Sequence, residues 1–329
     1  MRKFIVSDLH GDYNIYMSII SYLENISKEE EVELYINGDL IDRGIYSADL
    51  LIDVKKRIEN NNPFKIIYLA GNHEQLMWDA YPVYKRTDKN RWFDLHNNTD
   101  WGNFGGSITE SCMEDMLTEQ EEDNMFHFVK KLKLYHKFEE TLNSKPIVLA
   151  HAKVPMLAKK ICDLTIEDVN SDINDVIDLI FYRKEHLILP EEREKFDILW
   201  ASKINRVTRI PDDNINLGND LYFSIVGHTP NDSKYGFEYD INHNVLNIDS
   251  GLNLYWKGYF EYDHVPLVEI DSKNNRLIIL TFNHNNEIIY GNYFDGNIVP
   301  MNNMELNSYK KNLNKQLILK PVPDKDLFE

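Results

Sequence analysis

The sequence has few cysteines, few cationic residues and no long apolar run, and each shortage excludes a class of protein. Cys112 and Cys162 are the two cysteines among 329 residues, so neither a disulfide framework nor a thiolate zinc site is expected. No apolar run approaches the roughly 18 residues of a membrane-spanning helix. Lys and Arg number 36 against 54 Asp and Glu, and the resulting net charge of −18 disfavours nucleic acid as a partner. We therefore expect a cytoplasmic protein without membrane association.

Two common catalytic motifs are also missing. The chain has neither a Walker-type Gly-Lys-Ser/Thr loop nor a Gly-x-Ser-x-Gly elbow, which argues against nucleotide kinases and serine hydrolases. A hydrophobic content of 43% is nevertheless enough to bury a sizeable core, so we expect a folded α/β protein.

The first 75 residues alternate between short apolar runs and longer amphipathic segments, a pattern typical of a β-α-β-α-β arrangement. We expect strands at Phe4–Ser7, Val32–Ile36 and Phe64–Leu69, and helices at Ile15–Ile26 and Ser47–Ile58.

A polar cluster follows each of these three strands. The clusters are Asp8–Gly11, Gly38–Gly44 and Gly71–Glu74. Because ligands of α/β sheets bind at the carboxyl ends of strands, we expect the three clusters to form one site.

Later strands extend this pattern. Pro146–Ala150 leads directly to His151, and Leu221–Val226 leads to Gly227 and His228. Further short strands are expected at Val245–Asp249, Val265–Ile270, Arg276–Phe282 and Glu287–Asn292, with Asn-Asn turns at 274–275 and 285–286.

The remaining segments suggest a single domain over residues 1–302, with a polar C-terminal tail over 303–329. Helical insertions are expected at about 78–134 and 155–220. Because they lie between the site clusters, we expect them to influence substrate choice. The sequence predicts no particular oligomeric state.

The side chains in the clusters suit a pair of divalent cations held roughly 3.5–4 Å apart. Carboxylate, amide and imidazole donors fit such ions, and a carboxylate such as that of Asp39 can bridge two of them. The candidate metal ligands are Asp8, His10, Asp39, Asn72, His151 and His228.

Three neighbouring residues are candidates for catalysis. His73 can protonate a leaving oxygen, and Asp42 can orient that imidazole and hold it protonated. Arg43 can present its planar guanidinium to phosphate oxygens.

Any one cluster alone is more often a turn or a helix cap than a metal site. Five clusters in order, each after an apolar run, favour the metal site instead. Asp249 is interpreted as a turn carboxylate, with a role beside the metal ligands as the alternative. The histidines outside the clusters, His284 among them, are interpreted as surface or satisfied side chains, and Glu119–Asp123 as a helix start or solvated face.

The clusters together resemble a known family. In order and spacing they are similar to the motif series of the phosphoprotein phosphatases, which are calcineurin-like metallophosphoesterases. The chain most resembles bacterial and phage serine/threonine protein phosphatases and symmetrical diadenosine tetraphosphate hydrolases. Trp101–Gly106 with Thr109, and Ile248–Gly251, are similar to further segments of these proteins.

The resemblance implies a four-layer fold, with a central β-sandwich flanked by helices, and two metal ions, either Mn²⁺ or an Fe/Zn pair. One ion would take Asp8, His10 and Asp39. The other would take Asp39, Asn72, His151 and His228. A metal-bridging hydroxide would attack phosphorus directly and in line, without a phosphoenzyme.

The chain departs from the family at two positions that concern the site. Ser7 replaces the glycine that often precedes the first aspartate. Ser202 stands where bacterial members carry a second phosphate-binding arginine after a late tryptophan, so Arg206 and Lys203 are the candidates for that role.

Three functions remain open. The leading hypothesis is a serine/threonine protein phosphatase that also acts on small phosphoesters. The second is a dinucleoside polyphosphate hydrolase or cyclic nucleotide phosphodiesterase. The third is a partner-binding regulator built on a phosphatase scaffold, in which the insertions and the tail do the binding.

Overall fold

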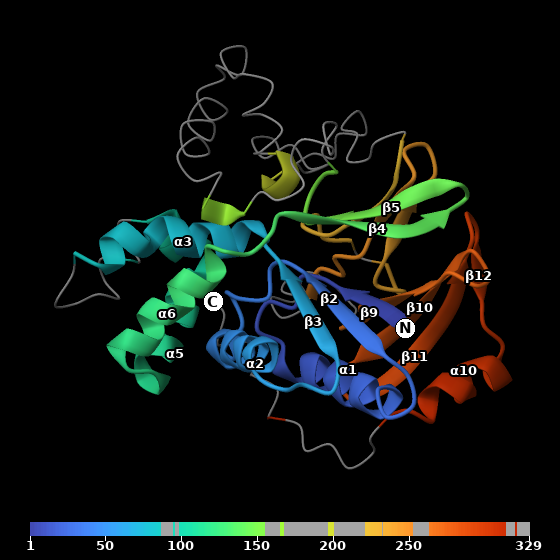
Figure 1. The fold of residues 1–329 in the computed structure, drawn as a ribbon, viewed down its shortest axis with the longest axis horizontal. Coiled ribbons are helices and arrows are strands. Elements are labelled where there is room, and N and C mark those ends of the chain that lie inside the picture. The colour runs from blue at the N-terminus through green and yellow to red at the C-terminus, as the bar shows by residue number, and fades with distance from the viewer. Residues whose placement is uncertain are drawn as a thin grey trace.

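The computed structural model describes residues 1–86, 95, 99–154, 165–167, 197–200, 221–231, 233–252, 263–313 and 320. Two β-sheets lie face to face, and helices cover the outer face of the larger sheet (Figure 1). None of the helices in these residues is both long and apolar enough to cross a membrane.

The larger sheet has seven strands in the order β12-β11-β10-β9-β1-β2-β3. Its parallel part confirms the expected β-α-β-α-β arrangement, with β1 (Arg2–Val6), β2 (Val32–Asn37) and β3 (Lys65–Leu69) paired side by side. The antiparallel part consists of β9 (Val265–Asp271), β10 (Arg276–Asn283), β11 (Glu287–Phe294) and β12 (Ile298–Pro300).

Asparagines close the two hairpins of this antiparallel part, as the sequence predicts. Asn275 and Asn286 adopt left-handed backbone conformations, with φ of 49° and 59°. Asparagine tolerates this region better than most residues, which explains its place in both turns.

The smaller sheet has the order β4-β5-β6-β8-β7. Its strands are β4 (Tyr135–Leu142), β5 (Lys145–Ala150), β6 (Phe223–Val226), β7 (Glu238–Asp240) and β8 (Val245–Asn247). The sequence pattern does not predict β4, because this strand carries several charged residues and its pairing with β5 is interrupted by a register shift.

Alternate residues of β1 point to opposite faces of the larger sheet, and both faces are buried. Ile5 lies in the apolar core between the sheets, together with Phe138 and Ile147 of the smaller sheet. Phe4 and Val6 lie in the other core, beneath the helices. Burial on both sides explains why this strand reads as a continuous apolar run.

The helices α1 (Tyr13–Ile26) and α2 (Ser47–Glu59) connect the parallel strands and cover the outer face (Figure 1). A second group consists of α3 (Asn72–Tyr84), the π-helical turn η1 (Gly102–Gly106), α5 (Ser107–Met116) and α6 (Glu119–Val129). Thr118 caps α6, which confirms the acidic stretch as a helix start.

The segment predicted as a tail begins with a helix, α10 (Asn303–Lys310), that the sequence analysis does not anticipate. Asn302 caps it, and Leu306 packs against the core beneath the helices. Farther along, the Asn25 amide of α1 donates to the Asn312 carbonyl at 2.8 Å. This part of the chain is therefore attached to the domain.

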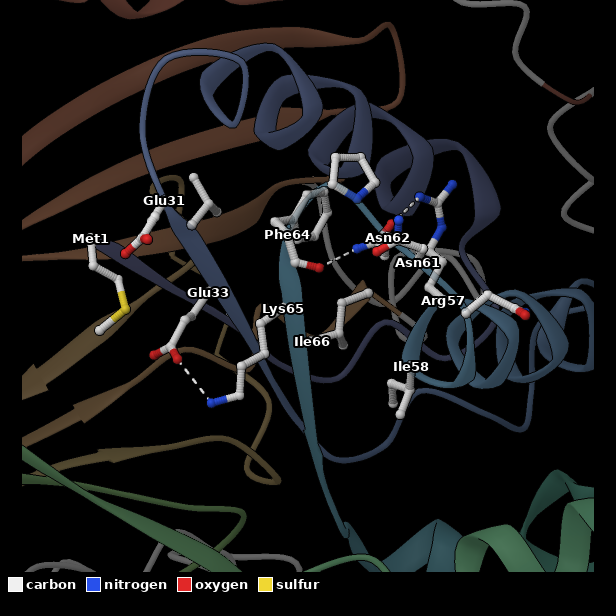
Figure 2. A pocket seen from close by; sticks show the side chains of 13 residues that line it. Met1, Glu31, Glu33, Arg57, Ile58, Asn61, Asn62, Phe64, Lys65 and Ile66 are labelled. Carbon is white, nitrogen blue, oxygen red and sulfur yellow. Dashed lines mark hydrogen bonds and ion pairs between the residues drawn. The ribbon is translucent and has the colours of Figure 1, made fainter.

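A cavity of about 420 Å³ lies at the N-terminal ends of the parallel strands (Figure 2). Both of its cationic side chains have acidic partners, with the Lys65 ammonium 2.9 Å from Glu33 and the Arg57 guanidinium 2.6 Å from Asp53. The polar clusters predicted from the sequence lie at the opposite, C-terminal ends of these strands.

Candidate metal and phosphate site

The loops that follow β1, β2, β3, β5 and β6 meet at one end of the two sheets. Several of their residues have left-handed backbones, including Asp8 (φ 56°), His10 (φ 42°), Asp39 (φ 48°) and His228 (φ 63°). Such conformations cost roughly 1 kcal/mol or more for residues other than glycine. They cluster where polar side chains converge, as is common at functional sites.

Glu74 holds two of these loops together. Its buried carboxylate accepts hydrogen bonds from the backbone N–H groups of Asp39 (2.8 Å), Leu40 (3.0 Å) and Gly71 (2.7 Å). The Tyr68 hydroxyl donates a further bond at 2.6 Å. The loops after β2 and β3 are thereby fixed against each other.

Glycine is required at position 71 because the two loops touch there. A Cβ atom on Gly71 would collide with the Asp39 carboxylate and backbone N–H. The Asp39 side chain can therefore lie directly over the start of α3.

Two groups of side chains in the described residues have the donors to hold a metal ion. One contains His10, Asp39 and His73, and the other contains Asp39, His151 and His228, with the ligand atoms of each group within 4.8 Å of one another. Asp39 belongs to both groups, the arrangement expected of a bridging carboxylate.

The imidazoles are oriented by backbone carbonyls. His10 Nδ1 lies 2.9 Å from the Ile41 carbonyl, and His151 Nδ1 lies 2.9 Å from the Asn37 carbonyl. Each Nδ1 donates to its carbonyl, which turns Nε2 toward the site. This is the usual support of a metal-binding histidine.

Asn72 places its amide oxygen in the second group. The oxygen lies 3.1 Å from His151 Nε2 and 2.8 Å from His228 Nδ1. Asp39 Oδ1 is 3.3 Å from the same His151 nitrogen. Four atoms with lone pairs converge here, so the residues fit a divalent cation.

Asp8 is the predicted ligand that neither group contains. Its buried carboxylate lies against the Ser7 hydroxyl and accepts a 3.1 Å hydrogen bond from the His228 backbone N–H. The Ser7 oxygen also lies 3.0 Å from the Asn37 carbonyl, so it contacts both the Asp8 carboxylate and this carbonyl. The serine thus positions the Asp8 carboxylate at the edge of the site.

The three predicted catalytic residues lie together. His73 Nδ1 is 2.7 Å from Asp42 Oδ2, and both side chains are fully buried. Asp42 is held by the Trp101 indole N–H at 3.0 Å and by the Thr109 hydroxyl at 2.6 Å.

Arg43 lies between the imidazoles of His10 and His73. Its Nη1 and Nη2 are each 2.8 Å from an Nε2 atom, one on His10 and one on His73. Because guanidinium only donates, both Nε2 atoms accept in this arrangement. The guanidinium is therefore placed at the first metal-binding group.

Lys203 and Arg206, predicted to bind phosphate, lie outside the described residues, as does Ser202. The preceding Trp200 is described, and its indole N–H donates to the Gln75 side chain at 2.6 Å.

The family model for calcineurin-like phosphoesterases matches residues 1–265. The chain belongs to this family. Members of the family hydrolyse phosphoesters with a dinuclear divalent metal centre, so this calcineurin-like phosphoesterase is an enzyme of that kind, with its four-layer α/β fold. None of the curated proteins compared with the chain matches it.

Three solved structures are similar to this chain. A serine/threonine phosphatase from Saccharomyces cerevisiae with similarity to human phosphatase PP5 is 15% identical, with 86% of this chain and 80% of that chain covered and a TM-score of 0.47. A cold-active protein-tyrosine phosphatase of a psychrophilic Shewanella species is 15% identical, with 92% of this chain and 80% of that chain covered and a TM-score of 0.43. A putative diadenosine tetraphosphatase is 14% identical, with 85% of this chain and 93% of that chain covered and a TM-score of 0.41. Similarity at this level does not indicate which of their substrates, if any, this chain shares.

Negative charge is concentrated in the site of this phosphoesterase. Burial, and then the neighbouring Asp249, raise the pKa of Asp8 well above its usual range. Burial and Asp39 raise the pKa of Asp249 to about 6. For Asp39, burial is outweighed by the imidazoles of His151 and His73, which hold its pKa well below the usual range. A site with three buried carboxylates is suited to cations.

Two residues of this site have roles that the sequence indicates weakly or not at all. Glu74 belongs to a quoted motif, but its role in tying the loops together was not predicted. The signal was its position three residues into a helix after Gly71, where a carboxylate reaches back to the backbone. Asp249 is buried beside Asp8 and Asp39, which fits the alternative given for it from the sequence better than a turn carboxylate.

Proposed function

We propose that this phosphoesterase is a phosphomonoesterase that removes phosphate from phosphoserine and phosphothreonine in proteins, and that it works with Mn²⁺ in the cytoplasm. The observation that carries the proposal is the position of Arg43, whose guanidinium meets both the metal-binding His10 and the candidate acid His73. A phosphate bound by Arg43 would lie beside both.

The residues that would hold the metals are the six predicted ligands. Asp8, His10 and Asp39 would hold one ion, and Asp39, Asn72, His151 and His228 the other. When bound, the ions polarise phosphoryl oxygens and lower the pKa of the attacking water. The Fe/Zn pair is the alternative to manganese.

Arg43 binds the phosphate in this proposal. Its two terminal nitrogens, which face imidazoles in the structure, turn to two phosphate oxygens, a match that the planar guanidinium makes well. The turn also frees Nε2 of His73. The movement of Arg43 that binds the phosphate therefore also exposes the His73 imidazole.

His73 completes the reaction as the proton donor. Once Arg43 has turned to the phosphate, Nε2 of His73 is free to take up a proton from water. Water attacks phosphorus as the bond from phosphorus to the serine or threonine oxygen breaks, and the Nε2 proton passes to that oxygen. Asp42 accepts from His73 Nδ1 and fixes the orientation of the imidazole. Trp101 and Thr109 keep the Asp42 carboxylate in place.

Hydrolysis of a nucleotide diester or a phosphate anhydride is the second candidate. Within the described residues, Arg43 is the only predicted phosphate-binding cation at the site. A phosphomonoester carries more negative charge per phosphorus than a diester and would benefit more from a second cation. The single arginine therefore favours the diester or anhydride as substrate.

A substrate panel with the Mn²⁺-loaded full chain separates these functions. We expect a phosphothreonine peptide to be hydrolysed faster than diadenosine tetraphosphate or a 2′,3′-cyclic nucleotide. His73→Asn should lower turnover by roughly 10²–10⁴-fold without changing metal content. His127→Asn, which alters a partly exposed imidazole on α6, should retain activity. Metal-loaded protein that is inert to every phosphoester would refute the proposal.

A further inference from the structure

One aromatic side chain at the site is exposed. Phe104 belongs to the π-helical turn η1 and is 44% exposed, whereas Trp101 in the same turn region is buried and bonded to Asp42. The turn is kinked at Gly105, whose φ of 102° is not helical. None of the roles assigned above uses Phe104.

On one side, Phe104 adjoins the phosphate-binding arginine. The Gly105 carbonyl, next in the chain, accepts a hydrogen bond from the Arg43 backbone N–H at 3.3 Å. A Cβ atom on Gly105 would lie 3.1 Å from Arg43 Cγ, and φ at Gly105 is 102°. Glycine at 105 therefore brings this turn into contact with Arg43.

On the other side, Phe104 adjoins the metal-binding residues through Trp200. The two rings meet edge to face, with centroids 6.1 Å apart. The Trp200 ring in turn meets the His228 ring at 6.2 Å. Phe104 thus lies between the contact of Gly105 with Arg43 and the contact of Trp200 with His228.

The surroundings hold the Phe104 ring in a defined position. Trp200 is fixed by its 2.6 Å hydrogen bond to Gln75, and the turn is fixed because Gly106 packs directly on the Trp101 indole. An exposed aromatic ring on a rigid support is a surface suited to another ring.

We propose that Phe104 is a specificity-determining residue that packs against an aromatic leaving group and so raises kcat/KM for aryl phosphates such as phosphotyrosine relative to alkyl phosphates. The inference rests on the proposed phosphomonoesterase function. A phosphotyrosine ring is joined to phosphorus through a single oxygen, so it lies close to a phosphate held by Arg43. A nucleobase is separated from its phosphate by a ribose and would lie farther away.

The test compares two peptides of the same sequence, one with phosphotyrosine and one with phosphothreonine. Phe104→Leu removes the ring but keeps an apolar side chain, and Phe104→Tyr keeps the ring. We expect Phe104→Leu to lower kcat/KM for the phosphotyrosine peptide roughly fivefold. The phosphothreonine value should change less than about twofold, and Phe104→Tyr should retain both activities.

Three outcomes would overturn the inference. Equal losses on both peptides would mean that the ring only supports the turn. A second outcome is that Phe104→Leu instead lowers kcat/KM for AMP relative to ribose 5-phosphate while the ratio of kcat/KM for the two peptides stays unchanged. That result would assign the ring to binding a nucleobase. Wild-type protein inert to both peptides would remove the proposed function together with the inference, whereas the first two outcomes leave that function standing.

Discussion

A buried histidine away from the metal-binding groups should make the stability of this protein depend on pH. His284, in the turn between β10 and β11, is 7% exposed. Its Nδ1 lies 2.7 Å from Asp263 Oδ2, and its Nε2 contacts the Asp12 carboxylate. Asp12 also caps α1 by accepting from the Ile15 N–H at 2.9 Å. The imidazole therefore ties the β10–β11 hairpin to the start of α1.

The two carboxylates favour the charged imidazole. Burial alone would lower the pKa of His284, but Asp12 and then Asp263 raise it to about 9. In the unfolded chain the value is about 6.5. The stabilisation is thus complete below about pH 6.5 and is lost as the pH rises through about 9, and the gap corresponds to about 3 kcal/mol of unfolding free energy.

Urea unfolding of metal-free wild-type protein and His284→Gln, followed by circular dichroism at about pH 6 and pH 10, tests this reasoning. The difference in free energy of unfolding between the two proteins should be about 3 kcal/mol larger at the lower pH. Asp263→Asn removes one of the two carboxylates. In that background, the effect of His284→Gln on the free energy of unfolding should depend less on pH. A difference between wild type and His284→Gln that is the same at both pH values would refute the reasoning.

Other predictions concern the supports of the site and the C-terminal segment. Glu74→Ala leaves four donors without their acceptor and should lower the free energy of unfolding by about 3 kcal/mol while weakening metal binding, as urea unfolding and metal analysis would show; unchanged stability would contradict it. Thr109→Val removes a hydrogen bond to Asp42 and should lower kcat roughly 10-fold at constant metal content. Lys320, whose ammonium lies 4.5 Å from the Tyr46 ring centroid, should stabilise the protein by about 1 kcal/mol. Lys320→Met should therefore cost less in a Tyr46→Leu background than in the wild type.

The parallel strands and their loops could be predicted because the relevant signals are local. An apolar run buried on both faces, followed at once by a polar cluster, is visible in a short stretch of sequence. Asp39 illustrates this, since it follows β2 after a single glycine. Its place in both metal-binding groups then follows from the meeting of strand ends.

The parts that could not be predicted depend on contacts between distant residues. Asp42 is held by Trp101 and Thr109, which are 59 and 67 residues away. Asp249 is brought to the site by the pairing of β8 with β6. Phe104 is aimed by the contact of Gly105 with Arg43, for which the sequence offers only a pair of glycines.

The central claim is that two divalent ions are held around Asp39, and the most direct test is the metal content of the wild type and Asp39→Asn after loading with Mn²⁺. We predict two ions per wild-type chain and a loss of both metal binding and p-nitrophenyl phosphate hydrolysis in Asp39→Asn. Asp115→Asn, which alters an exposed carboxylate on α5, should match the wild type. Asp39→Asn that binds two ions and hydrolyses the substrate at the wild-type rate would contradict the account.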